Sequence, residues 1–153
     1  MPWRADVSTS TETTRTFETY DATLAKVEFL TPRVKSFRFQ LPEGKMINFR
    51  AGQFVQMFIP TPDKIRRTSY SVASPPFDKD YVDLCVTLVR DGVSSNYLHA
   101  MKEGDKLKMM GPLGKFTHPE TLPRDTVFIA TGSGIAPFRS MIHELLFQTT
   151  QKN

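Results

Sequence analysis

The sequence contains a glycine turn of a kind that binds phosphate groups. Gly132-Ser133-Gly134 follows a continuous apolar run over 126–130 and precedes a helical pattern over 135–147. Glycines let the backbone approach a ligand closely, and the first N–H groups of a helix attract anions. The order of strand, glycine turn and helix is typical of nucleotide-binding units. Because the full G-x-G-x-x-G spacing is missing, these residues alone also fit a plain strand-to-helix turn.

Two further segments carry groups suited to a phosphorylated aromatic ligand. Gly92-Val93-Ser94-Ser95 would place successive N–H groups and two hydroxyls at the start of another helix. Arg66-Arg67-Thr68-Ser69-Tyr70-Ser71 combines cations, hydroxyls and one aromatic ring on a predicted strand. Taken singly, the first segment also fits an ordinary helix N-cap, and the second a charged edge strand with a core tyrosine.

Short strands are predicted to position these groups. Apolar and β-branched residues separated by Gly and Pro turns indicate strands over 22–30, 34–41, 53–59, 66–73, 81–90 and 106–110. Six short strands at this spacing favour a small antiparallel barrel. One helix over 96–102 interrupts them, capped by Ser94 or Ser95 and ended by Gly104.

The two ends of the chain differ from this middle part. Residues 1–19 lack apolar periodicity and are expected to form a disordered tail. Residues 20–120 would form the barrel, and 121–153 would begin an α/β domain with a strand buried on both faces over 126–130. Because a parallel nucleotide-binding sheet needs several strands, the sequence predicts a truncated α/β domain.

Composition narrows the class of protein. The 153 residues are 39% hydrophobic and 24% charged, with a net charge of +4, which is ordinary for a globular domain. No apolar run approaches the roughly 20 residues that span a bilayer, so no membrane span is expected. Cys85 is the only cysteine, which excludes an internal disulfide and favours a reducing, cytoplasmic location. The three histidines have no metal-site spacing, so no metal is expected.

Four motifs together resemble the ferredoxin–NADP⁺ reductase family, which includes oxygenase reductases and the reductase part of flavohaemoglobins. They occur in that family's order and spacing, and are Tyr70-Ser71-Val72-Ala73-Ser74-Pro75, Gly92-Val93-Ser94-Ser95-Asn96-Tyr97-Leu98, Gly111-Pro112-Leu113-Gly114-Lys115-Phe116 and Thr131-Gly132-Ser133-Gly134-Ile135-Ala136-Pro137-Phe138-Arg139-Ser140. The resemblance covers about residue 20 to the C-terminus. It implies a mainly β protein, with a six-stranded antiparallel Greek-key barrel and one capping helix, followed by the first β-α of a truncated α/β nucleotide-binding domain.

The resemblance also implies a role for each matching residue. Tyr70 would lie along the flavin ring or ribityl chain, and Ser71 would hydrogen-bond near flavin N5, as the only candidate catalytic residue. The remaining flavin-binding residues would be Arg66, Arg67, Thr68, Ser69, Val86 through its backbone, Gly92, Val93, Ser94, Ser95 and, beneath the isoalloxazine, Thr131. The nicotinamide nucleotide would meet Gly132, Ser133, Gly134, Ile135, Ala136 and Pro137.

One departure from the family concerns its Arg-x-Tyr-Ser pattern. Thr68 stands where the family has arginine, two residues before Tyr70. Side chains alternate along a strand, so Arg67 should face away from Tyr70, whereas Arg66 shares its face but lies about 7 Å further along. Three arrangements stay open: a bulge that turns Arg67 round, Arg66 reaching back, or a weaker bond from Thr68.

The function implied by the resemblance is electron transfer. The intact protein would pass electrons from NAD(P)H through bound FAD, with FMN as the less common alternative, to ferredoxin or another iron–sulfur or haem partner. A non-catalytic flavin-binding or partner-docking module is the alternative. A nucleic-acid-binding barrel would suit the basic pI of about 9.3, but it leaves the hydroxyl–glycine motifs unexplained, so no nucleic acid is expected.

Overall fold

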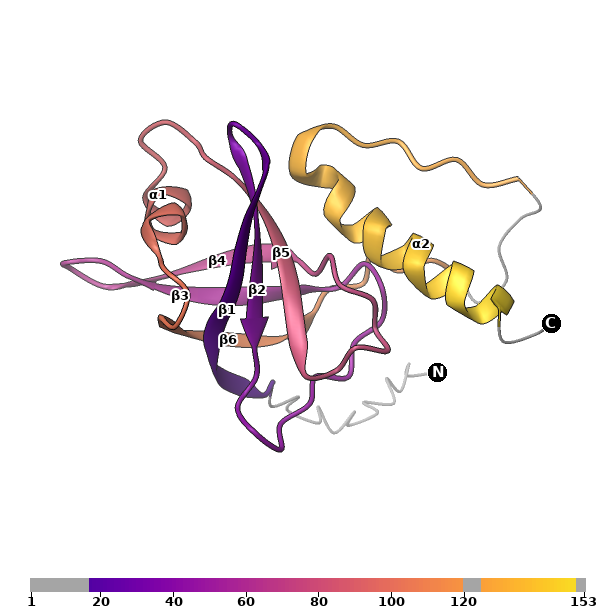
Figure 1. Ribbon diagram of the computed structural model, residues 1–153, viewed down its shortest axis with the longest axis horizontal. Coiled ribbons are helices and arrows are strands. Elements are labelled where there is room, and N and C mark those ends of the chain that lie inside the picture. The colour runs from indigo at the N-terminus through magenta and orange to yellow at the C-terminus, as the bar shows by residue number, and fades with distance from the viewer. Residues whose placement is uncertain (1–16, 120–124, 151–153) are drawn as a thin grey trace, which may run out of the picture.

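The structure, a computed structural model, describes residues 17–119 and 125–150 (Figure 1). Its strands are β1 (Thr19–Thr31), β2 (Val34–Gln40), β3 (Phe54–Pro60), β4 (Ile65–Ser71), β5 (Tyr81–Thr87) and β6 (Lys106–Leu113). The helices are α1 (Val93–Ala100), the 3₁₀ helix η1 (Gly132–Gly134) and α2 (Ile135–Thr150). Most of the predicted tail, residues 1–16, lies outside the described residues, and β1 begins within its last part.

The six strands form one antiparallel sheet, as predicted. Their order is β4-β3-β6-β1-β2-β5, so neighbours that are distant in sequence, such as β3 and β6, give Greek-key crossovers. An isolated bridge between Val72, just after β4, and Leu84 of β5 connects the two ends of the sheet. The sheet therefore curls like a barrel without closing through a continuous ladder.

The core of the sheet follows from strand alternation. Tyr20, Ala22 and Leu24 on β1 are buried, while the residues between them are exposed or half-buried. Leu98 brings α1 onto the same core. Along β3, Val55, Met57 and Ile59 are buried and pair with Tyr70, Thr68 and Arg66 of β4. Because directly opposed residues share a face, these three site residues lie on the core-facing side of the sheet.

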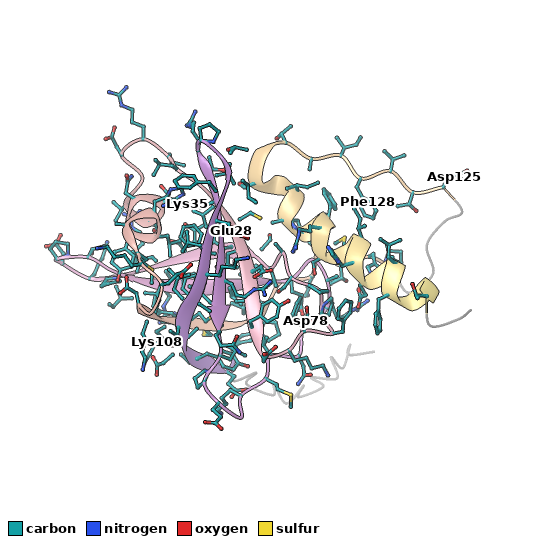
Figure 2. The ribbon with its side chains drawn as sticks, viewed as in Figure 1. Glu28, Lys35, Asp78, Lys108, Asp125 and Phe128 are labelled. Carbon is teal, nitrogen blue, oxygen red and sulfur yellow. The ribbon has the colours of Figure 1, made fainter. Side chains whose placement is uncertain are left out.

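The predicted strand over 126–130 is wrong. The segment has no regular structure, and the side chains of Val127 and Ile129 are 81% and 83% exposed. A strand needs a neighbour for its backbone hydrogen bonds, and no β-ladder joins this segment to another described one. Only Phe128 turns inward, with its ring centroid 5.1 Å from that of Phe138 on α2 (Figure 2).

The helix α2 is confirmed and extends to Thr150. It lies beside β5 on the outside of the sheet (Figure 1). Ala136 at its start packs with Ala73 and Cys85 in a small buried cluster. Among the described residues, no helix combines the length and apolar character needed to span a membrane.

Candidate functional site

A groove runs between the start of α1 and one face of β4. It has a volume of about 250 Å³ and is lined by Arg66, Thr68, Tyr70, Val89, Gly92, Val93, Ser94 and Ser95. Seven of these eight were predicted site residues, and only Val89 was missed. Two of the three predicted ligand-binding segments are therefore brought together.

The regularity of β4 decides which of its side chains enter the groove. The strand pairs with β3 in unbroken register from Ile65 to Ser71, so no bulge alters the alternation. Arg66 and Thr68 share the face of Tyr70. Arg67 lies on the opposite face, with its guanidinium 5.0 Å from the centre of the Phe58 ring. The bulge alternative for Arg67 is thus wrong.

Two other predicted residues of β4 are absent from the groove lining. Ser69 is exposed and shares the face of Arg67 by alternation. Ser71 ends the strand, is half-buried and pairs with Phe54 of β3. Its predicted contact near a flavin nitrogen stays a prediction.

Tyr70 forms a fixed wall of the groove. Its ring is half-buried and packs against the main core. Burial raises the pKa of its hydroxyl, because the ionised phenolate would lose solvation. Tyr70 therefore offers a neutral, positioned ring to a ligand.

The floor of the groove is a hydroxyl pair. The Oγ1 atom of Thr68 lies 2.6 Å from the Oγ atom of Ser94, and either can donate the hydrogen bond. This contact ties β4 to α1. Thr68, which stands where the family pattern has an arginine, is thus hydrogen-bonded to Ser94.

The start of α1 differs from the predicted serine cap. The N-cap is Gly92, and no side-chain hydrogen bond caps the helix. The Oγ atom of Ser95 instead accepts from the Val89 N–H at 3.2 Å and donates to the Gly92 carbonyl at 3.1 Å. The serine points back into the turn because its short side chain reaches these backbone groups there.

Asn96, which the sequence reasoning missed, holds the same turn. Its Nδ2 atom donates to the carbonyls of Gly92 and Val89 at 2.8 and 3.1 Å. A Cβ atom on Gly92 would lie 2.7 Å from Ser95 Oγ and 2.9 Å from Val89 Cβ. The turn is therefore closely packed, and a side chain at position 92 would displace its neighbours. The presence of an amide side chain at the end of the G-V-S-S-N motif could have predicted this role from the sequence.

Backbone donors at the start of α1 are left for a ligand. The first helical hydrogen bond is donated by Asn96 N–H to Gly92 O, at 2.9 Å. Helix geometry leaves the N–H groups of Val93, Ser94 and Ser95 without acceptors in the helix, and the first turn has no acidic residue. The groove therefore presents donors and a positive helix end, which fits an anion such as a diphosphate.

Arg66 adds a full charge to this arrangement. Its guanidinium makes no hydrogen bond or ion pair within residues 17–119 and 125–150. An arginine without a partner can bind a phosphate in a bidentate manner. Of the three arrangements that the sequence left open, two therefore remain: Arg66 reaches back to the ligand, or Thr68 donates a weaker bond.

Val86 lies on β5 and is not part of the groove lining. Its side chain is buried, and its carbonyl lies 3.0 Å from Nε2 of His99 on α1. The carbonyl of His99 accepts a hydrogen bond of 3.0 Å from Nζ of Lys35. These contacts hold α1 on the sheet, and they involve a histidine and a lysine that the sequence reasoning did not connect with the site.

The second glycine turn lies apart from the groove. Gly132–Gly134 forms η1, with the Gly134 N–H donating to Thr131 O at 3.0 Å. Ala136 is buried against the barrel. None of the predicted nicotinamide-binding residues lines the groove between β4 and α1. Within the described residues, no cluster of three or more metal-binding side chains occurs.

Comparison with known proteins identifies several relatives. The family described as "Oxidoreductase FAD-binding domain" matches residues 21–118. Ferredoxin–NADP reductase B of Sorangium cellulosum is 39% identical over 129 residues, covering 84% of this chain and 53% of that protein. The reductase component DmpP of phenol 2-monooxygenase from Pseudomonas sp. is 35% identical, covering 84% and 36%.

Solved structures agree with these sequence relatives. A ferredoxin NADP⁺ reductase from Neisseria gonorrhoeae with bound FAD and NADP gives a TM-score of 0.70 at 29% identity, covering 87% of this chain and 53% of that one. The cytochrome P450 reductase GcoB of Amycolatopsis gives 0.75 at 26% identity, covering 83% and 38%. The chain spans about half, or less, of the length of these relatives.

Proposed function

Since the chain belongs to the oxidoreductase FAD-binding domain family, we propose that it is the flavin-binding part of an NAD(P)H-dependent reductase. The main support for this proposal is the groove in which Arg66, Thr68 and Tyr70 of β4 lie next to the N–H groups at the start of α1 that have no acceptor within the helix. FAD is the cofactor that this family binds.

Different groove residues bind different parts of the cofactor. The N–H groups of Val93, Ser94 and Ser95, together with Arg66, hold the diphosphate by charge and hydrogen bonds. Tyr70 supports the flavin ring or ribityl chain. FAD supplies the redox chemistry when bound, accepting a hydride and releasing electrons singly, so the chain's own task is to bind and orient it.

Three residues outside the groove lining complete the proposed flavin site. Ser71 follows Tyr70 directly and would hydrogen-bond near the reactive nitrogen of the flavin. Thr131 would lie below the ring, and the Val86 backbone would support the nucleotide from behind α1. These roles rest on the match of each residue to the family's motifs.

NAD(P)H is the proposed electron donor, and the turn at the start of α2 is its proposed contact. The residues are Gly132, Ser133, Gly134, Ile135, Ala136 and Pro137. The positive φ of Gly132, 55°, and the open space around Gly132 and Gly134 allow close approach of a phosphate. Ala136, being buried, would contribute through its backbone.

The proposed electron acceptor is an iron–sulfur or haem protein or domain. Support comes from the relatives, which include reductase components of phenol 2-monooxygenase and terephthalate 1,2-dioxygenase, and a cytochrome P450 reductase. We place the protein in the cytoplasm, because its one cysteine, Cys85, is free and buried and a reducing compartment suits it. Cell fractionation with an antibody tests this location.

Binding of flavins to the purified chain tests the proposal. Titrations with FAD, FMN and riboflavin, followed by flavin fluorescence, should give tighter binding for FAD and FMN than for riboflavin, which has no phosphate. Equal weak binding of all three would argue that the groove is not a phosphate site. FAD that binds this chain but is never reduced by NADPH, even when the chain is fused to the remaining part of a relative such as ferredoxin–NADP reductase B, would support the alternative of a non-catalytic flavin module.

A further inference from the structure

Two residues in the motif at the start of α2, Arg139 and Ser140, have no role in the proposed flavin and nucleotide contacts. Both reach back to the barrel. The Nη1 atom of Arg139 donates to Ala73 O at 2.6 Å, and the Oγ atom of Ser140 donates to Ser74 O at 2.7 Å. Ser74 and Ser140 are both 0% exposed. Two side chains of α2 thus bind consecutive carbonyls of the segment that follows β4.

The segment that accepts these bonds is itself fixed to β5. The Ala73 N–H donates to Asp83 O at 2.8 Å, and the Asp83 N–H donates to Ser74 Oγ at 3.1 Å. The Asp83 carboxylate binds Arg38 through two hydrogen bonds of 2.8 and 2.9 Å, and Arg139 approaches it to 3.8 Å. Any movement of α2 relative to this segment must therefore break buried polar contacts.

We propose that Arg139 and Ser140 form a latch that positions the nucleotide turn of Gly132–Gly134 beside β5 and the segment that follows β4. The acceptors of the latch follow Ser71 after one intervening residue, Val72, and its donors lie on α2 in the second turn after Gly134. The functional meaning of these two segments rests on the proposed function. The latch residues touch neither ligand and act by positioning.

Cys85 provides a built-in reporter of the latch. It is the only cysteine, is 8% exposed, and packs under α2 with Ala73 and Ala136. It lines a cavity of about 140 Å³ together with Arg139. Burial raises the pKa of its thiol, which lowers the fraction of reactive thiolate. A closed latch should therefore keep Cys85 slow toward a bulky aromatic disulfide, and an open latch should release it.

The test measures the rate at which Cys85 of the whole 153-residue chain reacts, without flavin and under native conditions. Ser140→Ala should accelerate the reaction by about tenfold or more, because a buried carbonyl loses its donor. Arg139→Ala should act in the same direction but by less, because the positive charge of Arg139 lowers the pKa of the Cys85 thiol and its loss reduces the thiolate fraction. Asp83 keeps its bonds to Arg38 in this variant. The matched control is Thr150→Ala, which removes a hydroxyl bonded only within α2, to Leu146 O at 2.9 Å; its rate should match wild type.

The urea dependence of the rate separates a latch from a general loss of stability. Local opening exposes little surface, so the rate in the latch variants should rise only weakly with urea, whereas global unfolding gives the full slope. A full slope, or unchanged rates in both Ser140→Ala and Arg139→Ala, would overturn the latch. Because no flavin is present, failure of FAD to bind the wild-type chain would count against the proposed function alone.

Discussion

At the scale of single residues, the site depends on one arginine of an adjacent pair. Arg66 faces the groove, while Arg67 stacks on Phe58 on the other side of β4. The presence of a charged pair was readable from the sequence. Which arginine faces the ligand was not, because the answer depended on whether β4 contains a bulge.

We expect Arg66→Ala to weaken FAD binding by about tenfold, because it removes a charge-assisted contact with the diphosphate. Arg67→Ala is the matched control, since it removes the same charge from the opposite face, and it should leave the dissociation constant within about twofold. Isothermal titration with FAD measures both. A larger loss in Arg67→Ala than in Arg66→Ala would contradict the assignment.

The hydroxyl pair of Thr68 and Ser94 gives a second residue-scale prediction. Thr68→Val and Ser94→Ala each remove one partner of a 2.6 Å hydrogen bond, so each should lower the free energy of unfolding by about 1 kcal/mol. The double variant should lose less than the sum, because one interaction is removed in all three. Urea unfolding measures this, and strict additivity would show that the two hydroxyls do not interact.

The pKa of Tyr70 gives a prediction with a defined sign. Burial favours the neutral phenol, so its pKa in the folded protein lies above the ordinary value. The resulting stabilisation is present below the unfolded-state pKa of about 10 and is lost as pH rises through the folded-state value. The tyrosinate absorbance of the wild-type and Tyr70→Phe proteins should be titrated with pH. The difference between the two curves should show a tyrosine whose pKa lies above the ordinary value. A difference curve at the ordinary pKa would contradict the burial of Tyr70.

At the scale of elements, the sequence predicted the six strands of the described sheet and the helices α1 and α2. The strands and helices could be predicted from the apolar pattern and from the Gly and Pro turns, because both depend on local backbone geometry. The strand over 126–130 was predicted wrongly, since its apolar residues satisfy the pattern of a buried strand but no β-ladder joins it to another described segment. The serine cap of α1 was also wrong, because Ser95 bonds to the turn behind it.

The turn before α1 is the element on which the groove depends. Gly92→Ala should weaken FAD binding by more than about tenfold, because the new Cβ would meet Ser95 Oγ and Val89 Cβ and displace the N–H groups of α1. Circular dichroism should show a folded sheet, since the turn lies outside the main core. Unchanged FAD affinity in a folded Gly92→Ala protein would contradict the role of this turn.

At the scale of the whole molecule, the described residues place the proposed flavin groove between β4 and α1, and none of the proposed nicotinamide-binding residues lines that groove. We expect the 153-residue chain to bind FAD weakly and to oxidise NADPH slowly, because the described residues offer the nucleotide only η1 and the start of α2. Stopped-flow absorbance after mixing with NADPH measures this. Rapid steady turnover by the purified chain would contradict it.

The central claim, that the groove between β4 and α1 binds FAD, is tested most directly by mapping FAD onto the protein. A chain of 17.4 kDa suits amide chemical-shift mapping by NMR during an FAD titration. We predict that the largest shifts occur over residues 66–70 and 89–95 and that they saturate together. Saturating shifts confined to other parts of the chain, with these two segments unchanged, would contradict the account.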